Sequence, residues 1–353
     1  MRIGIIFHKN PFAPPTGIDL VRLRAIAGGL IRRGVDAEII SPVDKEGMID
    51  QIIPVRGLKA LSIRGRYDLV KTSYHFSLEL VGEYQGPLVS RVVRVVDGHL
   101  PERDEAFRER LLKCQEMIRH RASVLVLNNR ENRDRWGRLY GNEPPVVLVP
   151  TGCPAHIPRS RGNPYLLNEK VALFLGSISA PRMAALLNEA ARRLKDRCRI
   201  HLVGLNKACL YGSLEECTLD PLIVDHGELP EDEVWDYIRH AHMGLAFATG
   251  PHAFDNDVSK ILNYLRGGLP VLSEEPILNN ELIRQTEYGK TFSYGDANEL
   301  ASAALEVLER SPLEKRSWVM NFMATEHSWD RRVDAYVELF REILAAPVKT
   351  SFS

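Results

Sequence analysis

Short apolar runs alternate with amphipathic stretches from the start of the chain. Residues 3–7 form an uninterrupted apolar run, which is typical of a buried parallel strand. A loop rich in proline and glycine follows over residues 10–17. The next apolar side chains recur at helical spacing, at Leu20, Leu23, Ala27, Leu30 and Ile31. Basic residues and Gly34 then end the predicted helix, and residues 35–40 are predicted to be a second strand.

The alternation continues through the first half of the chain. Further strands are predicted at residues 68–72, 88–96, 124–127 and 146–149, with helices at 104–120 and 130–140. Strands that alternate with helices favour a parallel sheet that is covered on both faces.

The pattern pauses at residues 151–168, a polar stretch rich in glycine and proline that indicates a linker. It then restarts, with strands predicted at 171–175, 200–203, 222–225, 244–248 and 270–273, and helices at 182–194, 232–240 and 259–265. We therefore expect an α/β protein with two Rossmann-like domains, residues 1–160 and 161–325. Open α/β sheets bind ligands at the carboxyl ends of their strands, so the two domains should face each other across a binding cleft.

One helix start carries candidate chemistry. A polar loop over residues 254–258 leads into the predicted helix, where Asp257 or Ser259 is a plausible N-cap and Lys260 lies in the first turn. A lysine here opposes the helix dipole, but free amides together with a cation suit a bound diphosphate. An ordinary surface helix start is the alternative.

The chain has 353 residues, a length that suits two domains. Its charge is unevenly distributed along the sequence. Residues 1–160 hold 25 Lys and Arg against 18 Asp and Glu, whereas the remainder holds 21 against 28. The basic first half suggests an anionic partner, either a membrane surface or a phosphorylated acceptor, unless the excess is simply spread over the surface. We expect no nucleic-acid partner, because basic and aromatic residues are not interleaved.

Cysteine usage and hydropathy bear on location. Five widely spaced cysteines with no metal-binding pattern fit reduced thiols, and we expect no metal site. The first apolar run is too short for a signal peptide, and no run is long enough to span a bilayer. We expect a cytoplasmic protein, with peripheral contact at the inner face of the cell membrane as an open alternative.

The stretch over residues 254–272 resembles the donor site of GT-B glycosyltransferases of the family-4 type (glycosyl transferases group 1). That family carries two acidic residues eight positions apart, followed by a Gly-Leu-Pro-Val turn, which residues 268–271 match. Asp255 takes the first acidic position and Asn263 the second, with Lys260 between them. The resemblance implies that Asp255 contacts the donor sugar, and that Asn263 replaces the carboxylate that normally holds the ribose.

Other segments resemble the same family in order along the chain. Ser177 occupies the position of a diphosphate-binding arginine, and Arg182 stands in for the lysine that follows it. His226 lies in the strand-turn segment that reads the base, and Gly17 matches a glycine near the donor. Ser259 opens the donor helix. Residues 327–331 resemble the start of a last helix that crosses back to the first domain, which we expect over residues 326–346.

The first domain is implied to bind the acceptor. Asp97 and His99 follow a predicted strand at the place where the family often has a histidine facing the sugar, and His can accept or orient a proton at neutral pH. His8 and His75 are weaker rivals for that role. The candidate catalytic groups are therefore His99, Asp97 and Asp255, and the alternative for His99 is an ordinary loop histidine beside a turn.

The resemblance implies a metal-independent hexosyltransferase of polysaccharide biosynthesis. Its donor is a nucleoside-diphosphate sugar such as a UDP-sugar, used as a substrate without a further cofactor, and its acceptor is a sugar, a glycan, a lipid-linked sugar or a small molecule. Two alternatives remain open, a nucleotide-sugar epimerase of the same architecture and a non-catalytic sugar-binding relative. An epimerase converts the donor alone, a transferase needs an acceptor, and a binding protein does neither.

Overall fold

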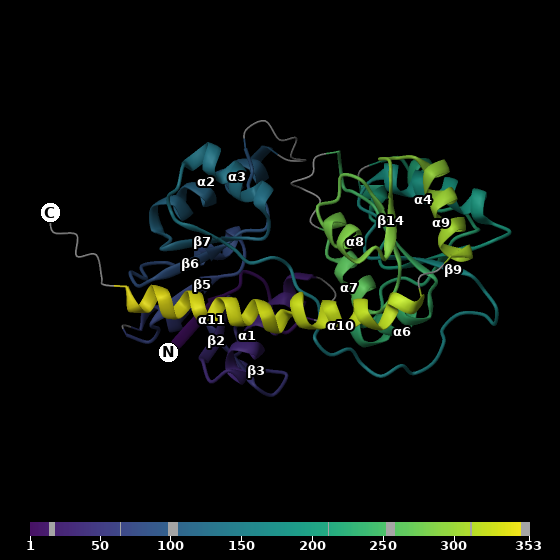
Figure 1. The fold of residues 1–353 in the computed structure, drawn as a ribbon. Helices are drawn as coiled ribbons and strands as arrows, with labels where there is room; N and C mark the ends of the chain where they lie inside the picture. Colours follow the sequence, from purple (N-terminus) through teal and green to yellow (C-terminus); the bar gives the residue numbers. More distant parts are fainter. Residues whose placement is uncertain are drawn as a thin grey trace. The chain divides into compact units, whose positions relative to one another are not determined.

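The structure is a computed structural model, which describes residues 1–13, 18–63, 65–97, 105–210, 212–251, 258–310 and 313–346. The chain divides into two compact units (Figure 1). The first unit combines residues 1–151 with the C-terminal segment from Trp329, and the second spans Gly152–Ser328. Three candidate site residues, Gly17, His99 and Asp255, lie outside the described residues.

The first unit is built on one eight-stranded sheet in the order β3-β4-β2-β1-β5-β6-β7-β8. All neighbouring strands are parallel except β3 and β4. The strands are β1 (Arg2–Ile6), β2 (Asp36–Ser41), β3 (Gly47–Ile49), β4 (Ile53–Gly57), β5 (Leu69–Thr72), β6 (Leu88–Arg91), β7 (Val124–Leu127) and β8 (Val146–Leu148). The helices are α1 (Ile18–Arg32), α2 (Glu105–Arg121), α3 (Arg130–Tyr140) and α11 (Trp329–Ala345).

Helices cover both faces of this sheet, with α2 and α3 on one side and α1 and α11 on the other (Figure 1). The C-terminal helix α11 packs against α1, as the resemblance implied. Gly29 of α1 lies so close to Val333 that an added Cβ would stand 2.5 Å from its Cγ2. Arg33 ties the same two segments together, since its Nε donates to Asp334 at 2.6 Å.

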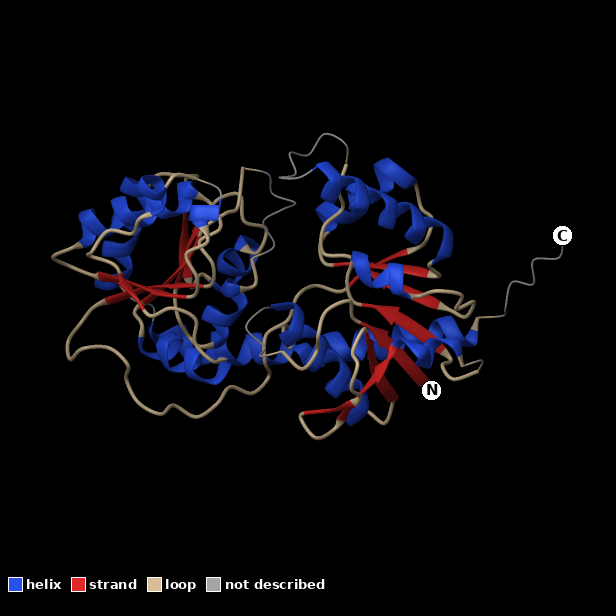
Figure 2. Cartoon of the chain, turned by 180° about the vertical axis from the view of Figure 1, so that it is seen from behind, coloured by secondary structure: helices blue, strands red, loops and turns tan. Residues whose placement is uncertain are grey.

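The second unit has a six-stranded, fully parallel sheet in the order β11-β10-β9-β12-β13-β14. The strands are β9 (Val171–Leu175), β10 (Arg199–Val203), β11 (Val224–Asp225), β12 (Met243–Ala246), β13 (Val271–Glu274) and β14 (Gly289–Phe292). Its helices are α4 (Pro181–Leu194), α5 (Leu214–Cys217), α6 (Glu231–His240), α7 (Lys260–Arg266), α8 (Asn280–Thr286), α9 (Ala297–Glu309) and α10 (Arg316–Glu326). In Figure 2 the strands of each unit lie between layers of helices.

The boundary between the units differs from the one predicted at residue 160. Residues 152–160 belong to the second unit because their backbone is bonded to it. Cys153 N–H donates to the His327 carbonyl at 2.9 Å. Arg266 of α7 donates to the carbonyls of Pro154 and Ala155 at 3.0 and 2.6 Å. The α/β class with two mostly parallel sheets is confirmed.

The predicted strand over residues 88–96 is too long, because β6 ends at Arg91. The apolar run continues and stays buried, but side chains take over its backbone hydrogen bonds. Val95 N–H donates to Asn132 of α3, and Val96 N–H donates to Gln115 of α2, each at 2.7 Å. The run therefore packs into the core without extending the sheet.

Candidate active site

The carboxyl edge of the second sheet gathers most of the described donor-site candidates. Ser177 follows β9, His226 follows β11, and Arg182 lies in the first turn of α4. Ser259, Lys260 and Asn263 lie at the start of α7 and within it. Loops that follow parallel strands meet at one edge of a sheet, which is where open α/β sheets bind ligands.

Tyr264 fixes α7 against the sheet. Its buried hydroxyl donates to the carbonyls of Leu173 and Leu245 at 3.0 and 3.2 Å and accepts the Leu175 N–H at 2.7 Å. The tyrosine thereby connects α7 to the neighbouring strands β9 and β12. Its ring also packs directly on Gly244, where an added Cβ would clash at 2.5 Å. Because Lys260 lies one helical turn earlier on α7, this anchor sets the position of its side chain.

The Lys260 side chain is half-buried. Its Nζ lies 3.9 Å from the centre of the Phe174 ring, a cation–π arrangement. It also lies beside Gly176, where an added Cβ would stand 3.8 Å from Nζ. Within the described residues, the structure shows no carboxylate or hydrogen-bond acceptor for this nitrogen. Burial lowers the pKa of Lys260 to about 7.

The turn after β9 lies beside Lys260. Gly176 has a φ of +98°, a conformation that glycine adopts at little cost. Gly204, after β10, approaches it so closely that an added Cβ would stand 2.2 Å from the Gly176 carbonyl oxygen. Ser177 directly follows Gly176 and is half-buried. A cation beside a narrow glycine turn at a strand end can accept an anionic group.

Arg182 is not a free cation. It forms a bidentate ion pair with Glu274, the fully buried last residue of β13, at 2.7 and 3.1 Å. It also donates to the Ala248 carbonyl and lies 4.1 Å from the centre of the Tyr294 ring. Glu274 further accepts the N–H groups of Ala248 and Gly295 at 2.6 and 2.8 Å. The pair joins the loops after β12, β13 and β14 to the start of α4.

Truncating Arg182 should therefore disturb the fold as well as any contact with the donor. Removal of its guanidinium would leave the Glu274 carboxylate buried with only two backbone donors. A buried charge that loses its partner destabilises the folded state. No local pattern connects Glu274 to Arg182, although a charged residue directly after a predicted buried strand was a usable signal.

His226 is held in a buried cluster. Its Nε2 lies 2.9 Å from Nδ1 of His201 on β10, and the Tyr237 hydroxyl lies 3.4 Å from its Nδ1. His201 Nε2 lies 3.4 Å from Glu169. Burial lowers the pKa of both histidines. The ring of His226 is therefore engaged with protein groups, and base recognition by the backbone of its turn stays a prediction.

For two further donor-site candidates, Ser259 and Asn263, the described part of the chain shows no side-chain hydrogen bond. Ser259 stands at the predicted N-cap position of α7, but it has helical backbone angles and its side chain makes no capping bond; Asp257, the other N-cap candidate, lies outside the described residues. Asn263 is half-buried on α7, where its N–H donates to the Ser259 carbonyl at 3.4 Å and its own carbonyl accepts the Gly267 N–H at 2.9 Å. Their proposed roles toward the donor stay predictions.

In the first unit, the Asp97 carboxylate pairs with Arg135 of α3. Of the two rival histidines, His8 is half-buried and His75 is buried. His8 follows β1 and stacks on Tyr74 at 5.3 Å, and burial lowers its pKa to about 4. His75 begins the 3₁₀ helix after β5, and burial lowers its pKa to about 3. Both are neutral at pH 7, which is the form that accepts a proton.

Two observations concern the expectations about metal binding and membrane contact. In the described part of the chain, no group of three or more His, Cys, Asp or Glu side chains could hold a metal ion. Within the same residues, no helix is long and apolar enough to cross a membrane. Metal independence therefore stays a prediction.

Comparison with known proteins bears on the fold. No model of a known protein family matches the chain, and a search of curated proteins found no match. Solved structures do match over nearly the whole chain. Sucrose-phosphate synthase from Thermosynechococcus elongatus is 15% identical, with a TM-score of 0.76 over 98% of this chain and 100% of that one.

Two further structures agree. HepE from Anabaena in complex with UDP-glucose is 15% identical, with a TM-score of 0.74 over 97% of this chain and 100% of that one. WaaG, a glycosyltransferase involved in lipopolysaccharide biosynthesis, is 12% identical, with a TM-score of 0.67 over 96% and 99%. The chain thus has the GT-B fold of these enzymes, as its sequence resemblance implied.

Proposed function

We propose that the chain is a metal-independent glycosyltransferase that moves a sugar from a nucleoside-diphosphate sugar to an acceptor. The acceptor is a sugar, a glycan or a lipid-linked sugar. The observation that carries this proposal is the half-buried Lys260, whose ammonium lies beside the Gly176 turn. It lies at the strand edge where α/β sheets bind ligands, in a fold whose matched structures include one in complex with UDP-glucose.

The chemistry follows from charge. When the bond between the sugar and the diphosphate breaks, negative charge builds on the departing diphosphate. A fixed cation beside that group stabilises the transition state more than the ground state. Lys260 is held by the Tyr264 anchor and the Phe174 ring, so little reorganisation is needed when the charge appears. An approaching diphosphate also favours the protonated form of the lysine.

The test is nucleoside-diphosphate binding by the wild type, Lys260→Met and Lys195→Met. Lys195 is an exposed lysine at the end of α4 and serves as the matched control. We expect one of UDP, GDP or ADP to raise the melting temperature of the wild type and of Lys195→Met, because a ligand that binds only the folded state stabilises it. Equal stabilisation of Lys260→Met would place the diphosphate elsewhere and remove the proposal's structural basis.

We further propose a cytoplasmic location with peripheral docking on anionic membrane. The cysteines at five positions are free, which fits a reducing compartment. The basic excess of residues 1–160 supports the docking, since each Lys or Arg near an anionic surface contributes about 1 kcal/mol. Sedimentation at low salt with anionic vesicles should pellet the protein, and neutral vesicles should not. Equal pelleting with both would contradict the docking.

A further inference from the structure

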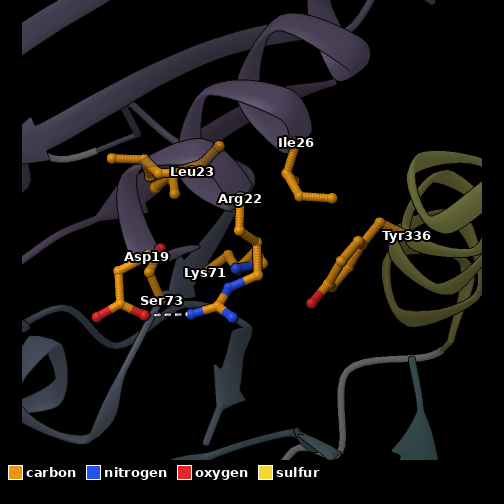
Figure 3. A pocket seen from close by; sticks show the side chains of 8 residues that line it. Asp19, Arg22, Leu23, Ile26, Lys71, Ser73 and Tyr336 are labelled. Carbon is orange, nitrogen blue, oxygen red and sulfur yellow. Dashed lines mark hydrogen bonds and ion pairs between the residues drawn. The ribbon is translucent and has the colours of Figure 1, made fainter. Parts of the chain in front are cut away.

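A small cavity lies inside the first unit, between the sheet and the helices α1 and α11 (Figure 3). Its polar lining comes from Asp19 and Arg22 of α1, Lys71 of β5, Ser73 just after β5, and Tyr336 of α11. Its free volume is about 260 Å³ including the opening, and the enclosed part holds about one water-sized particle. Asp19 lies in the first turn of α1 and Ser73 follows a strand end, so the cavity is at the carboxyl edge of the sheet.

Lys71 is the least compensated charge in this cavity. The residue is 3% exposed, and its Nζ makes a single hydrogen bond, to the Thr72 carbonyl at 3.3 Å. Nζ lies 5.1 Å from the centre of the Tyr336 ring. The described residues offer it no carboxylate within 4 Å. Burial, with the nearby charges of Arg91 and Arg22, lowers its pKa well below the ordinary value.

The remaining groups add donors and little negative charge. Arg22 is buried and pairs with Asp19 at 2.6 Å, the interaction drawn as a dashed line in Figure 3. Asp19 also accepts a hydrogen bond from Nζ of Lys9 at 3.1 Å, so its carboxylate is paired with two cations. Arg91, also buried, is bonded to the Tyr336 hydroxyl. Among the described residues, the buried hydroxyl of Ser73 has no hydrogen-bond partner.

The donors that line this cavity suit a compact anion with several acceptor oxygens. An ammonium with unused protons, a guanidinium and a free hydroxyl approach the same space from three elements, β5, α1 and the loop after β5. Hydrogen bonds from charged donors to an oxyanion are about twice as strong as neutral ones. We propose that this cavity binds a phosphoryl group, with one oxygen entering beside Lys71 and the others remaining at the opening near Ser73.

The phosphoryl group has two possible sources, free inorganic phosphate and a phosphorylated acceptor sugar. The second source rests on the proposed function, because the first unit is the one expected to bind the acceptor. The binding itself does not depend on transferase activity. It is a property of residues in the first unit, whereas Lys260 and the proposed diphosphate site lie in the second.

The experiment follows the melting temperature during titration with inorganic phosphate, with sodium chloride at matched ionic strength as the reference. The nucleoside diphosphate identified for the second unit is present at saturation, so phosphate cannot report on that site. Three proteins are compared, namely the wild type, Lys71→Met and Lys59→Met. Lys59 is an exposed lysine of the same unit. Methionine keeps the length of the side chain and removes an uncompensated buried amine, so Lys71→Met should fold.

We expect phosphate to raise the melting temperature of the wild type and of Lys59→Met in a saturable way. Loss of a charge-assisted bond should weaken phosphate binding to Lys71→Met by about tenfold or more. Because phosphates also stabilise proteins without binding to a site, the difference between the variants is the decisive quantity. No saturable effect in the wild type, or the same effect in Lys71→Met, would overturn the proposal.

Glucose 6-phosphate and glucose, titrated in the same way, distinguish the sources. A larger effect of the sugar phosphate than of inorganic phosphate would identify the acceptor, and equal effects would identify free phosphate; glucose alone should have none in this cavity. Calorimetry adds a second readout, because phosphate favours the protonated form of Lys71, and the proton uptake that accompanies binding should be absent in Lys71→Met. Nucleoside-diphosphate binding, measured separately, tests the proposed function on its own.

Discussion

The ion pair between Glu274 and Arg182 should stabilise the second unit, and Glu274→Gln tests this. Glutamine keeps the size of the side chain, removes the negative charge and replaces one acceptor oxygen with a donor. The native carboxylate accepts from both Arg182 nitrogens and from the N–H groups of Ala248 and Gly295. At least one of these four donors would lose its acceptor.

The magnitude follows from burial. Breaking a buried ion pair by removing one partner costs about 3–5 kcal/mol. Glu274 is fully buried, but the Arg182 side chain is 28% exposed, so water can partly solvate the remaining cation. The effect should therefore lie at the lower end, at about 3 kcal/mol. For a unit of this size that corresponds to a fall of about 6–12 °C in melting temperature.

Differential scanning calorimetry should show this fall in the transition of the second unit, and the transition of the first unit should be unchanged. Glu275→Gln is the matched control, because Glu275 is the next residue and is exposed. It should change stability by no more than about 0.5 kcal/mol. If Glu274→Gln melts at the same temperature as Glu275→Gln, the ion pair does not stabilise the unit and our interpretation of Arg182 is wrong.

Three further predictions concern protonation and metal. Since the pKa of Lys260 is about 7, nucleoside-diphosphate affinity should fall as pH rises from there towards about 9, and titration calorimetry should find no such slope in Lys260→Met. Burial lowers the pKa of His75 to about 3, so the unfolded state binds a proton below about pH 6.5 that the folded state rejects. Denaturant titrations should therefore show the free energy of unfolding falling from pH 6.5 to 4, and less steeply in His75→Gln; parallel curves would contradict this. Transfer activity should survive EDTA, whereas loss of activity that Mg²⁺ or Mn²⁺ restores would refute metal independence.

The sequence predicted the elements whose signal is local. Residues 124–127 and 171–175 are uninterrupted apolar runs, and the structure has β7 and β9 at those residues. It did not predict β14, because Gly289–Phe292 is short and contains a lysine. It extended β6 beyond Arg91, because a buried apolar run has the same composition whether a strand or side chains satisfy its backbone.

The candidate site was predictable only where the signal is local in the sequence. Lys260 could be found because a motif surrounds it in the chain. The pairing of Arg182 with Glu274 joins residues that are far apart in sequence, and no local pattern encodes it. Lys71 lies in a short strand whose sequence gives no sign of burial. Its environment depends on Tyr336 of α11, which the chain supplies only after the whole second unit.

The proposed reaction is transfer of a sugar from a nucleotide donor, with Lys260 of the second unit stabilising the departing diphosphate. It is tested most directly by the release of nucleoside diphosphate from a panel of nucleotide sugars, with and without acceptor sugars, glycans and lipid-linked sugars. We predict release that requires one donor and an acceptor, with a glycosylated product seen by mass spectrometry. Lys260→Met should release nucleoside diphosphate at least about 100-fold more slowly, and Lys195→Met at the wild-type rate. Conversion of the donor without any acceptor, or undiminished release by Lys260→Met, would contradict the account.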